Sequence, residues 1–70
     1  MFLLSRSNNK QIEYWNGVQF LSAQYQDGLA KAKRFASQKA GLQEASDAKA
    51  CWFDHEAGRW QGLPVNCNPE

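Results

Sequence analysis

The sequence predicts a small α+β domain in which one helix packs on one face of a small antiparallel sheet, with the element order βββ-α-ββ. Apolar and polar residues alternate near both ends of the chain, which is the period of a strand. Between these regions, apolar residues recur with the period of a helix. The chain has 70 residues, a length typical of one domain, so residues 1–70 are expected to form a single domain.

The first third of the chain is expected to be a meander of three short strands. These strands are predicted over residues 2 to about 6, 11–15 and 18–21. Residues 7–10 have turn chemistry, because Asn tolerates positive φ angles. Asn16 and Gly17 predict a tight type I′ turn, which requires two residues with positive φ.

The only extended helical pattern lies between Asp27 and Gly41. Asp27 is expected to cap the start of this helix and Gly41 to follow its last turn. The apolar stripe consists mostly of alanine, which allows a helix to lie close to a sheet. The stripe is formed by Leu29, Ala32, Ala36 and Ala40, with Phe35 at its edge.

The last third is predicted to form a second hairpin. It follows a polar segment, residues 43–47, that is interpreted as a loop or a short helical turn. Strands are expected at residues 49–54 and 59–63, joined by a loop at residues 55–58. Pro64 ends the last strand. Residues 64–70 are expected to form a loose C-terminal tail unless Cys67 anchors it.

Charge and hydropathy disfavour several classes of protein. The formal net charge is +1, which gives the whole molecule no strong attraction to nucleic acid or anionic membranes. No stretch approaches the roughly 20 apolar residues of a membrane span, and the apolar start of the chain is too short for a signal peptide. A cytoplasmic location is therefore expected, in which Cys51 and Cys67 are free thiols rather than a disulfide.

The sequence contains no convincing catalytic or metal-binding constellation. His55 is the only histidine, and it falls in a predicted hairpin tip where solvent is its expected neighbour. Cys51 would reach it only if the strand end folded back, so a Cys–His nucleophile is disfavoured. With Cys67 these residues offer three metal ligands but lack the paired CxxC knuckle of structural zinc sites. The chain is therefore expected to be neither an enzyme nor a cofactor-binding protein.

A basic face of the expected helix is the first candidate binding surface. Lys31, Arg34 and Gln38 point away from the alanine stripe, and Lys33 lies beside them. Such a surface can contact phosphates, although an exposed basic helix face is more commonly only solvated. Protein binding fits the composition better, because Trp, Tyr and Arg dominate the hot spots of protein interfaces.

Two segments of the chain resemble a known group of proteins. Residues 30–41 (AKAKRFASQKAG) and 52–60 (WFDHEAGRW) are similar to segments of small phage-encoded anti-CRISPR proteins that inhibit the type I-F surveillance complex. The matching residues are Ala32, Lys33, Arg34, Ala36 and Ser37 in the first segment and Asp54, Gly58, Arg59 and Trp60 in the second. Gln38 stands where a Lys would complete the first run, and the resemblance covers roughly half of the chain.

The resemblance implies a non-enzymatic inhibitor that binds the repeated Cas backbone subunits of an RNA-guided complex and obstructs target DNA. Because the chain has few acidic residues for DNA mimicry, steric obstruction is expected. The implied contact residues are Lys31, Lys33, Arg34 and Gln38 on the helix and Arg59 and Trp60 on the late hairpin. Two alternatives remain open: a small nucleic-acid-binding accessory protein that uses the basic helix face, and a small phage protein–protein interaction module, monomeric or weakly homodimeric.

Overall fold

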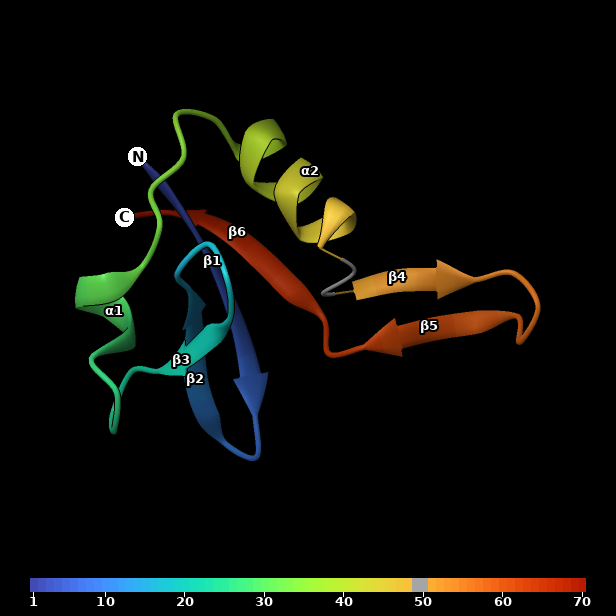
Figure 1. Ribbon diagram of the computed structural model, residues 1–70, viewed down its shortest axis with the longest axis horizontal. Coiled ribbons are helices and arrows are strands. Elements are labelled where there is room, and N and C mark those ends of the chain that lie inside the picture. Colours follow the sequence, from blue (N-terminus) through green and yellow to red (C-terminus); the bar gives the residue numbers. More distant parts are fainter. Residues whose placement is uncertain (49–50) are drawn as a thin grey trace.

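The computed structural model describes residues 1–48 and 51–70, with the backbone alone for residues 51–53 and 60. The elements are β1 (Phe2–Asn8), β2 (Gln11–Trp15), β3 (Phe20–Ser22), α1 (Gly28–Lys31), α2 (Gln38–Asp47), β4 (Cys51–Asp54), β5 (Arg59–Gly62) and β6 (Val65–Pro69). The predicted α+β class is confirmed. A four-stranded antiparallel sheet has the order β3-β2-β1-β6, and β4 with β5 forms a separate hairpin that extends away from it (Figure 1). The expected order βββ-α-ββ therefore gains a second short helix and a sixth strand.

Two turns shape the N-terminal meander, and one differs from the prediction. In the turn between β1 and β2, Asn9 and Lys10 have φ angles of 50° and 67°, which are the two positive values that close a tight hairpin. The tight turn expected at Asn16 and Gly17 is a longer loop, because β3 begins only at Phe20. The Asn16 side chain organises this loop by accepting two backbone hydrogen bonds of 2.8 Å.

The single helix expected over residues 29–40 does not form, and two shorter helices take its place. Asp27 precedes α1 as expected, but its φ is 52° and its side chain makes no capping hydrogen bond. α1 ends after four residues, and α2 begins after Ser37, whose Oγ accepts a backbone hydrogen bond of 3.1 Å from the first turn. Gly41 consequently lies inside a helix instead of ending one, and residues 43–47 are helical.

The segment between the two helices is extended and joins the sheet. Phe35 and Phe2 exchange two backbone hydrogen bonds of 2.8 Å, and the N–H of Lys33 donates to the carbonyl of Trp15 at 2.8 Å. This segment can enter because the register of β1 with β2 begins only at Ser5. Pairing with the sheet therefore overrides the helical preference of an alanine-containing segment.

The hydrophobic core lies between α2 and the sheet. Leu4 at its centre is fully buried. The side chains around it come from β2, the extended segment, α2 and β6, and they are Trp15, Phe35, Ala45 and Cys67. Gly41 allows α2 to approach closely, because a Cβ atom at this position would lie 2.7 Å from the Sγ of Cys67 and 3.3 Å from the Phe35 ring.

The C-terminal residues do not form the loose tail expected over residues 64–70. They form β6, which runs antiparallel to β1 with Cys67 opposite Leu4. Cys67 is only 3% exposed, and Val65 packs against the same core. Cys67 therefore anchors the segment, and the free edge of β1 supplies its backbone hydrogen bonds.

The contact between Gly41 and Cys67 gives a test of the packing. Gly41→Ala should destabilise the protein by about 1 kcal/mol, because overpacking typically costs about 1–3 kcal/mol and alanine returns about 0.5–1 kcal/mol of helix stability. In a Cys67→Ala background the clashing sulfur is absent, so Gly41→Ala should be nearly neutral there. Urea unfolding of the four proteins measures both effects; an equal loss in the two backgrounds would contradict the close approach.

Candidate functional site

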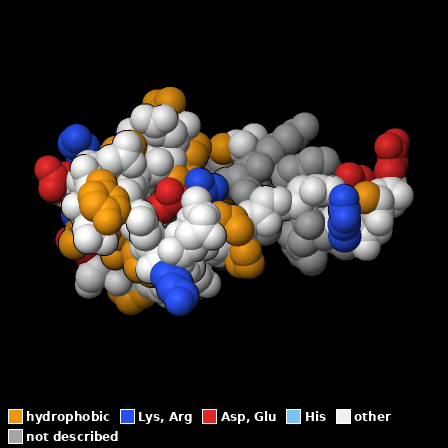
Figure 2. Space-filling view, turned by 90° about the horizontal axis from the view of Figure 1, so that it is seen from below, with side chains coloured by type: hydrophobic (Ala, Val, Ile, Leu, Met, Phe, Trp, Pro, Cys, Tyr) orange, Lys and Arg blue, Asp and Glu red, His pale blue; other side chains and the backbone are white. Residues whose placement is uncertain are grey.

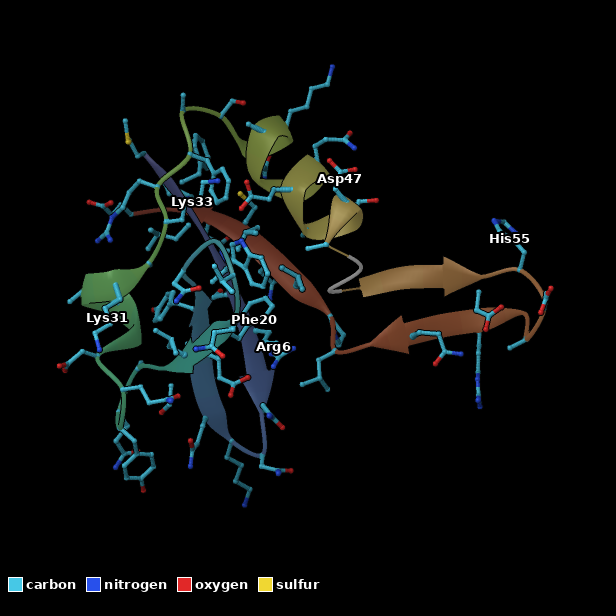
Figure 3. The ribbon with its side chains drawn as sticks, in the orientation of Figure 1. Arg6, Phe20, Lys31, Lys33, Asp47 and His55 are labelled. Carbon is cyan, nitrogen blue, oxygen red and sulfur yellow. The ribbon has the colours of Figure 1, made fainter. Side chains whose placement is uncertain are left out.

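The basic helix face predicted from the sequence is not present, because its residues lie on three different parts of the structure. Lys31 is exposed at the end of α1 (Figure 3). Lys33 and Arg34 lie in the extended segment, and Gln38 is the first residue of α2. The prediction that these four side chains share one helical surface is therefore wrong, since the helix that would align them is interrupted.

Lys33 joins three parts of the fold through Glu44. Its Nζ contacts the Oε1 of Glu44 at 2.5 Å, and the Nε1 of Trp15 donates to the Oε2 of Glu44 at 2.7 Å. The hydrogen bond from Lys33 lowers the pKa of Glu44; the bond from Trp15 and the charge of Lys33 act in the same direction, whereas partial burial opposes them. Lys33 thus connects the extended segment to α2, and Trp15 connects β2 to the same carboxylate.

Arg34 and Gln38 also have partners within the protein. Arg34 Nε contacts the Oε1 of Glu70 at 2.6 Å, and its Nη1 donates to the carbonyl of Ala32 at 2.7 Å. The hydrogen bond and charge of Arg34 lower the pKa of Glu70. Gln38 Nε2 donates to the carbonyl of Cys67 at 2.9 Å. Of the four residues predicted on the helix, Lys33, Arg34 and Gln38 therefore have contacts that hold the fold together.

A shallow groove lies on the sheet face opposite α2. Its volume is about 410 Å³, and its apolar surface comes from β1, α1 and the end of β6. The ion pair between Arg34 and Glu70 is part of its wall. The lining residues are Leu3, Ser5, Tyr14, Leu29, Arg34, Asn68, Pro69 and Glu70. The groove offers an apolar surface beside two charges of opposite sign that already neutralise each other.

The hairpin of β4 and β5 is the second candidate surface and the part of the chain that projects furthest from the sheet (Figures 1 and 2). Its outer end carries acidic and basic side chains, as Figure 2 shows. His55, Glu56 and Arg59 are exposed there, with His55 at the outermost turn (Figure 3). The side chain of Trp60 lies outside the described residues, whereas its backbone pairs with that of Phe53.

Asp54 builds the turn of this hairpin. Its Oδ1 accepts hydrogen bonds from the backbone N–H groups of Glu56 at 3.0 Å and Ala57 at 3.1 Å. Its Oδ2 accepts a hydrogen bond from Gln61 Nε2 at 3.3 Å. Gly58 closes the turn with φ of 69° and a backbone hydrogen bond of 2.8 Å to the Asp54 carbonyl. Asp54 and Gly58, two residues of the resembling segment 52–60, therefore position the exposed end of the hairpin.

The described residues contain no grouping of three or more His, Cys, Asp or Glu side chains that would hold a metal ion. Cys67 is a free thiol whose pKa is raised by burial, which disfavours the reactive thiolate. The predicted state of Cys51 concerns a side chain outside the described residues. Within the described part of the chain, no helix combines the length and the apolar character needed to cross a lipid bilayer.

Several residues that matter in the structure were not singled out by the sequence analysis. Glu44 lies in a segment that the sequence predicts as a loop or a short helical turn. Nothing in the local sequence indicates its contacts with the distant side chains of Trp15 and Lys33. The groove was missed because the C-terminal residues were expected to be loose. The alternation of Val65, Asn66, Cys67 and Asn68 has the period of a strand and was a signal that could have identified β6.

The fold thus defines a small α+β protein with a closed sheet-and-helix body and one projecting hairpin. Comparison of the chain with protein-family models, curated proteins and solved structures finds no match.

The contact between Glu44 and Lys33 predicts a pH-dependent stability. The pKa of Glu44 in the folded protein is lowered from its ordinary value of 4.5. The ionised carboxylate therefore adds to the free energy of unfolding above pH 4.5, and this stabilisation is lost as the pH falls through the lower folded-state pKa. Glu44→Gln keeps an acceptor for Trp15 and should cost about 0.5–1 kcal/mol at neutral pH, and this difference should shrink as the pH falls below 4.5. Unfolding by urea at several pH values measures it. The cost should also vanish in a Lys33→Gln background; a cost that persists there would mean that Lys33 is not the partner.

The role of Asp54 predicts that the hairpin turn depends on its carboxylate. Asp54→Ala removes two carboxylate oxygens that accept three hydrogen bonds, and it should speed the exchange of the Glu56 and Ala57 amide protons by about tenfold, as expected for the loss of roughly 1.4 kcal/mol. Asp54→Asn retains an oxygen acceptor and should have a much smaller effect. NMR measurement of amide exchange distinguishes them, with the amides of β1 as the internal control. Exchange of these amides in Asp54→Ala at the rate of the unmodified protein would show that Asp54 does not organise the turn.

Proposed function

We propose that this protein is a non-enzymatic inhibitor that binds another protein through the β4–β5 hairpin. The projection of this hairpin from the body is the observation that carries the proposal. Its exposed end includes Arg59, and arginine and tryptophan are enriched among the residues that dominate interface energies. Lys33, Arg34 and Gln38 are less suitable contacts, because binding through them would compete with their bonds inside the protein.

The proposed partner is an RNA-guided surveillance complex, with its Cas backbone subunits as the binding site. The support for this partner is the resemblance of residues 52–60 to a segment of type I-F anti-CRISPR proteins. Residues 32–37 of the first resembling segment are extended rather than helical, so the proposal no longer includes a helical contact surface. Arg59 and Trp60 are the proposed principal contacts, and exposed Lys31 is a secondary one.

Binding at this position would inhibit by obstruction. Surveillance complexes hold the guide–target duplex in a positively charged channel, and a bound protein beside that channel would prevent target DNA from entering. The hairpin contributes shape rather than a dense negative surface, since its described acidic residues are Asp54 and Glu56 and Asp54 is occupied by the turn. The proposed site of action is the cytoplasm of the host cell, where such complexes act.

The decisive experiment is binding to a purified type I-F surveillance complex. The tagged protein should retain the complex in a pull-down, and saturating amounts should prevent the complex from shifting labelled target DNA. If the complex is not retained, the inhibitor proposal is wrong for this target. The nucleic-acid alternative is tested in parallel by mixing the protein alone with labelled DNA and RNA at low salt, where electrostatic binding is strongest; a shift there would favour that alternative.

A charge reversal on the hairpin tests whether it is the contact surface. Arg59→Glu should weaken binding to the complex by at least about tenfold, as expected for the loss of a hot-spot residue. Lys39→Glu is the matched control, because it makes the same change of charge at an exposed position of α2. Biolayer interferometry measures both affinities, and circular dichroism checks that both variants fold. Equal affinities would place the interface outside the hairpin.

A further inference from the structure

The groove on the sheet face opposite α2 combines apolar side chains with one cation and one anion. Leu3 from β1, Tyr14 from β2 and Leu29 from α1 supply apolar surface, and Leu29 is 48% exposed. The volume of about 410 Å³ lies near the lower end of the roughly 300–1,000 Å³ that is typical of ligand pockets. The groove therefore suits a small ligand that has an apolar part.

The two charged residues of the groove wall, Arg34 and Glu70, are held to different degrees. The Nη1 of Arg34 donates to the carbonyl of Ala32 at 2.7 Å, which fixes the direction of the guanidinium group. The Glu70 side chain follows the last strand and is 47% exposed, so it can turn aside without disturbing the core. The two side chains meet through Nε and Oε1 at 2.6 Å. An ion pair this exposed contributes little to stability, so a ligand can open it at small cost.

The arrangement of these two charges selects the charge of the ligand. A ligand with only a carboxylate would replace Glu70 at Arg34 and would leave two negative charges side by side. A ligand with only an ammonium group would likewise place a second positive charge beside Arg34. A zwitterion avoids both problems, because its carboxylate can accept hydrogen bonds from Arg34 in the bidentate manner that guanidinium groups favour, while its ammonium group donates to Glu70. Each protein charge then regains a partner of opposite sign.

We propose that this groove binds a free amino acid with a large apolar side chain, whose α-carboxylate and α-ammonium groups insert between Arg34 and Glu70. The side chain of the ligand lies against the apolar surface of the groove. An aromatic side chain suits this surface well, because it can also pack against the ring of Tyr14. Binding here is separate from the proposed inhibition, since the lining residues of the groove include none from β4 or β5.

Titration of the protein with L-phenylalanine, followed by two-dimensional NMR, tests the site. At about pH 6 the α-amino group is protonated and the carboxylate is ionised. The amides of the groove residues should shift and saturate with a Kd of about 1 mM, an ordinary affinity for so small a ligand.

Two analogues of the probe separate its charges. N-acetyl-L-phenylalanine keeps the carboxylate but has no ammonium group, and L-phenylalaninamide keeps the ammonium group but has no carboxylate. Each analogue should bind about fivefold more weakly than phenylalanine, as expected for the loss of one exposed ion pair. Binding of either analogue as tightly as phenylalanine would overturn the inference, because a simple carboxylate or a simple amine would then suffice.

Variants of the protein assign each charge of the ligand to its partner. Glu70→Gln should remove the advantage of phenylalanine over its N-acetyl analogue, and Arg34→Gln should remove its advantage over the amide. Glu13→Gln is the matched control, because Glu13 is the anion of another ion pair, with Arg6 at 2.7 Å. Glu13 also precedes Tyr14 in β2 and therefore faces the other side of the sheet, so this variant should bind phenylalanine normally.

The NMR spectrum of each variant without ligand checks that it folds. Three further results would count against the site: no saturable shift up to about 20 mM phenylalanine, shifts confined to residues outside the groove, or an equal loss of affinity in Glu13→Gln and Glu70→Gln. All of these measurements use the protein alone, so their outcome is independent of binding to a surveillance complex.

Discussion

The pair of backbone hydrogen bonds between Phe2 and Phe35 is the constraint on which much of this structure depends. It draws the middle of the chain into the sheet and interrupts what would otherwise be one helix. The Phe35 ring then enters the core, and α2 lies over it. The same placement brings Lys33 to Glu44 and Arg34 to Glu70. One local conformational choice therefore decides that Lys33 and Arg34 form ion pairs within the protein, whereas Lys31 is exposed at the end of α1.

Close approach of backbone segments compensates for the small core. Gly28 places α1 against β3, because a Cβ atom there would lie 2.3 Å from the Leu21 carbonyl oxygen. Gly41 does the same for α2 against Cys67. A short chain buries only a modest fraction of its surface, so close packing between a few elements matters more than in a large domain. The buried Cys67 accordingly acts as a small apolar side chain that secures the last strand.

The molecule divides into a closed body and an open hairpin. In the body, ion pairs and side-chain hydrogen bonds join elements that are distant in sequence, such as Trp15 with Glu44 and Arg34 with Glu70. The β4–β5 hairpin instead directs its described hydrogen bonds into its own turn, mostly through Asp54. The exposed end of the hairpin is therefore positioned by contacts within the segment Cys51 to Gly62 itself.

The sequence by itself determined the α+β class, the position of β2, and a late hairpin, because alternation and turn residues are local signals. The hairpin was predicted over residues 49–63, of which 49 and 50 lie outside the described residues, and its strands span 51–54 and 59–62. Only the tertiary structure decided the fate of the segment around Phe35 and of the C-terminal residues around Cys67. Each of these segments becomes extended because a distant edge of β1 offers it backbone hydrogen bonds. Local propensity carries no information about such a partner. The predicted basic helix face is absent for this reason. Its four side chains would share one surface only on a continuous helix, and pairing with the sheet makes the middle of that segment extended.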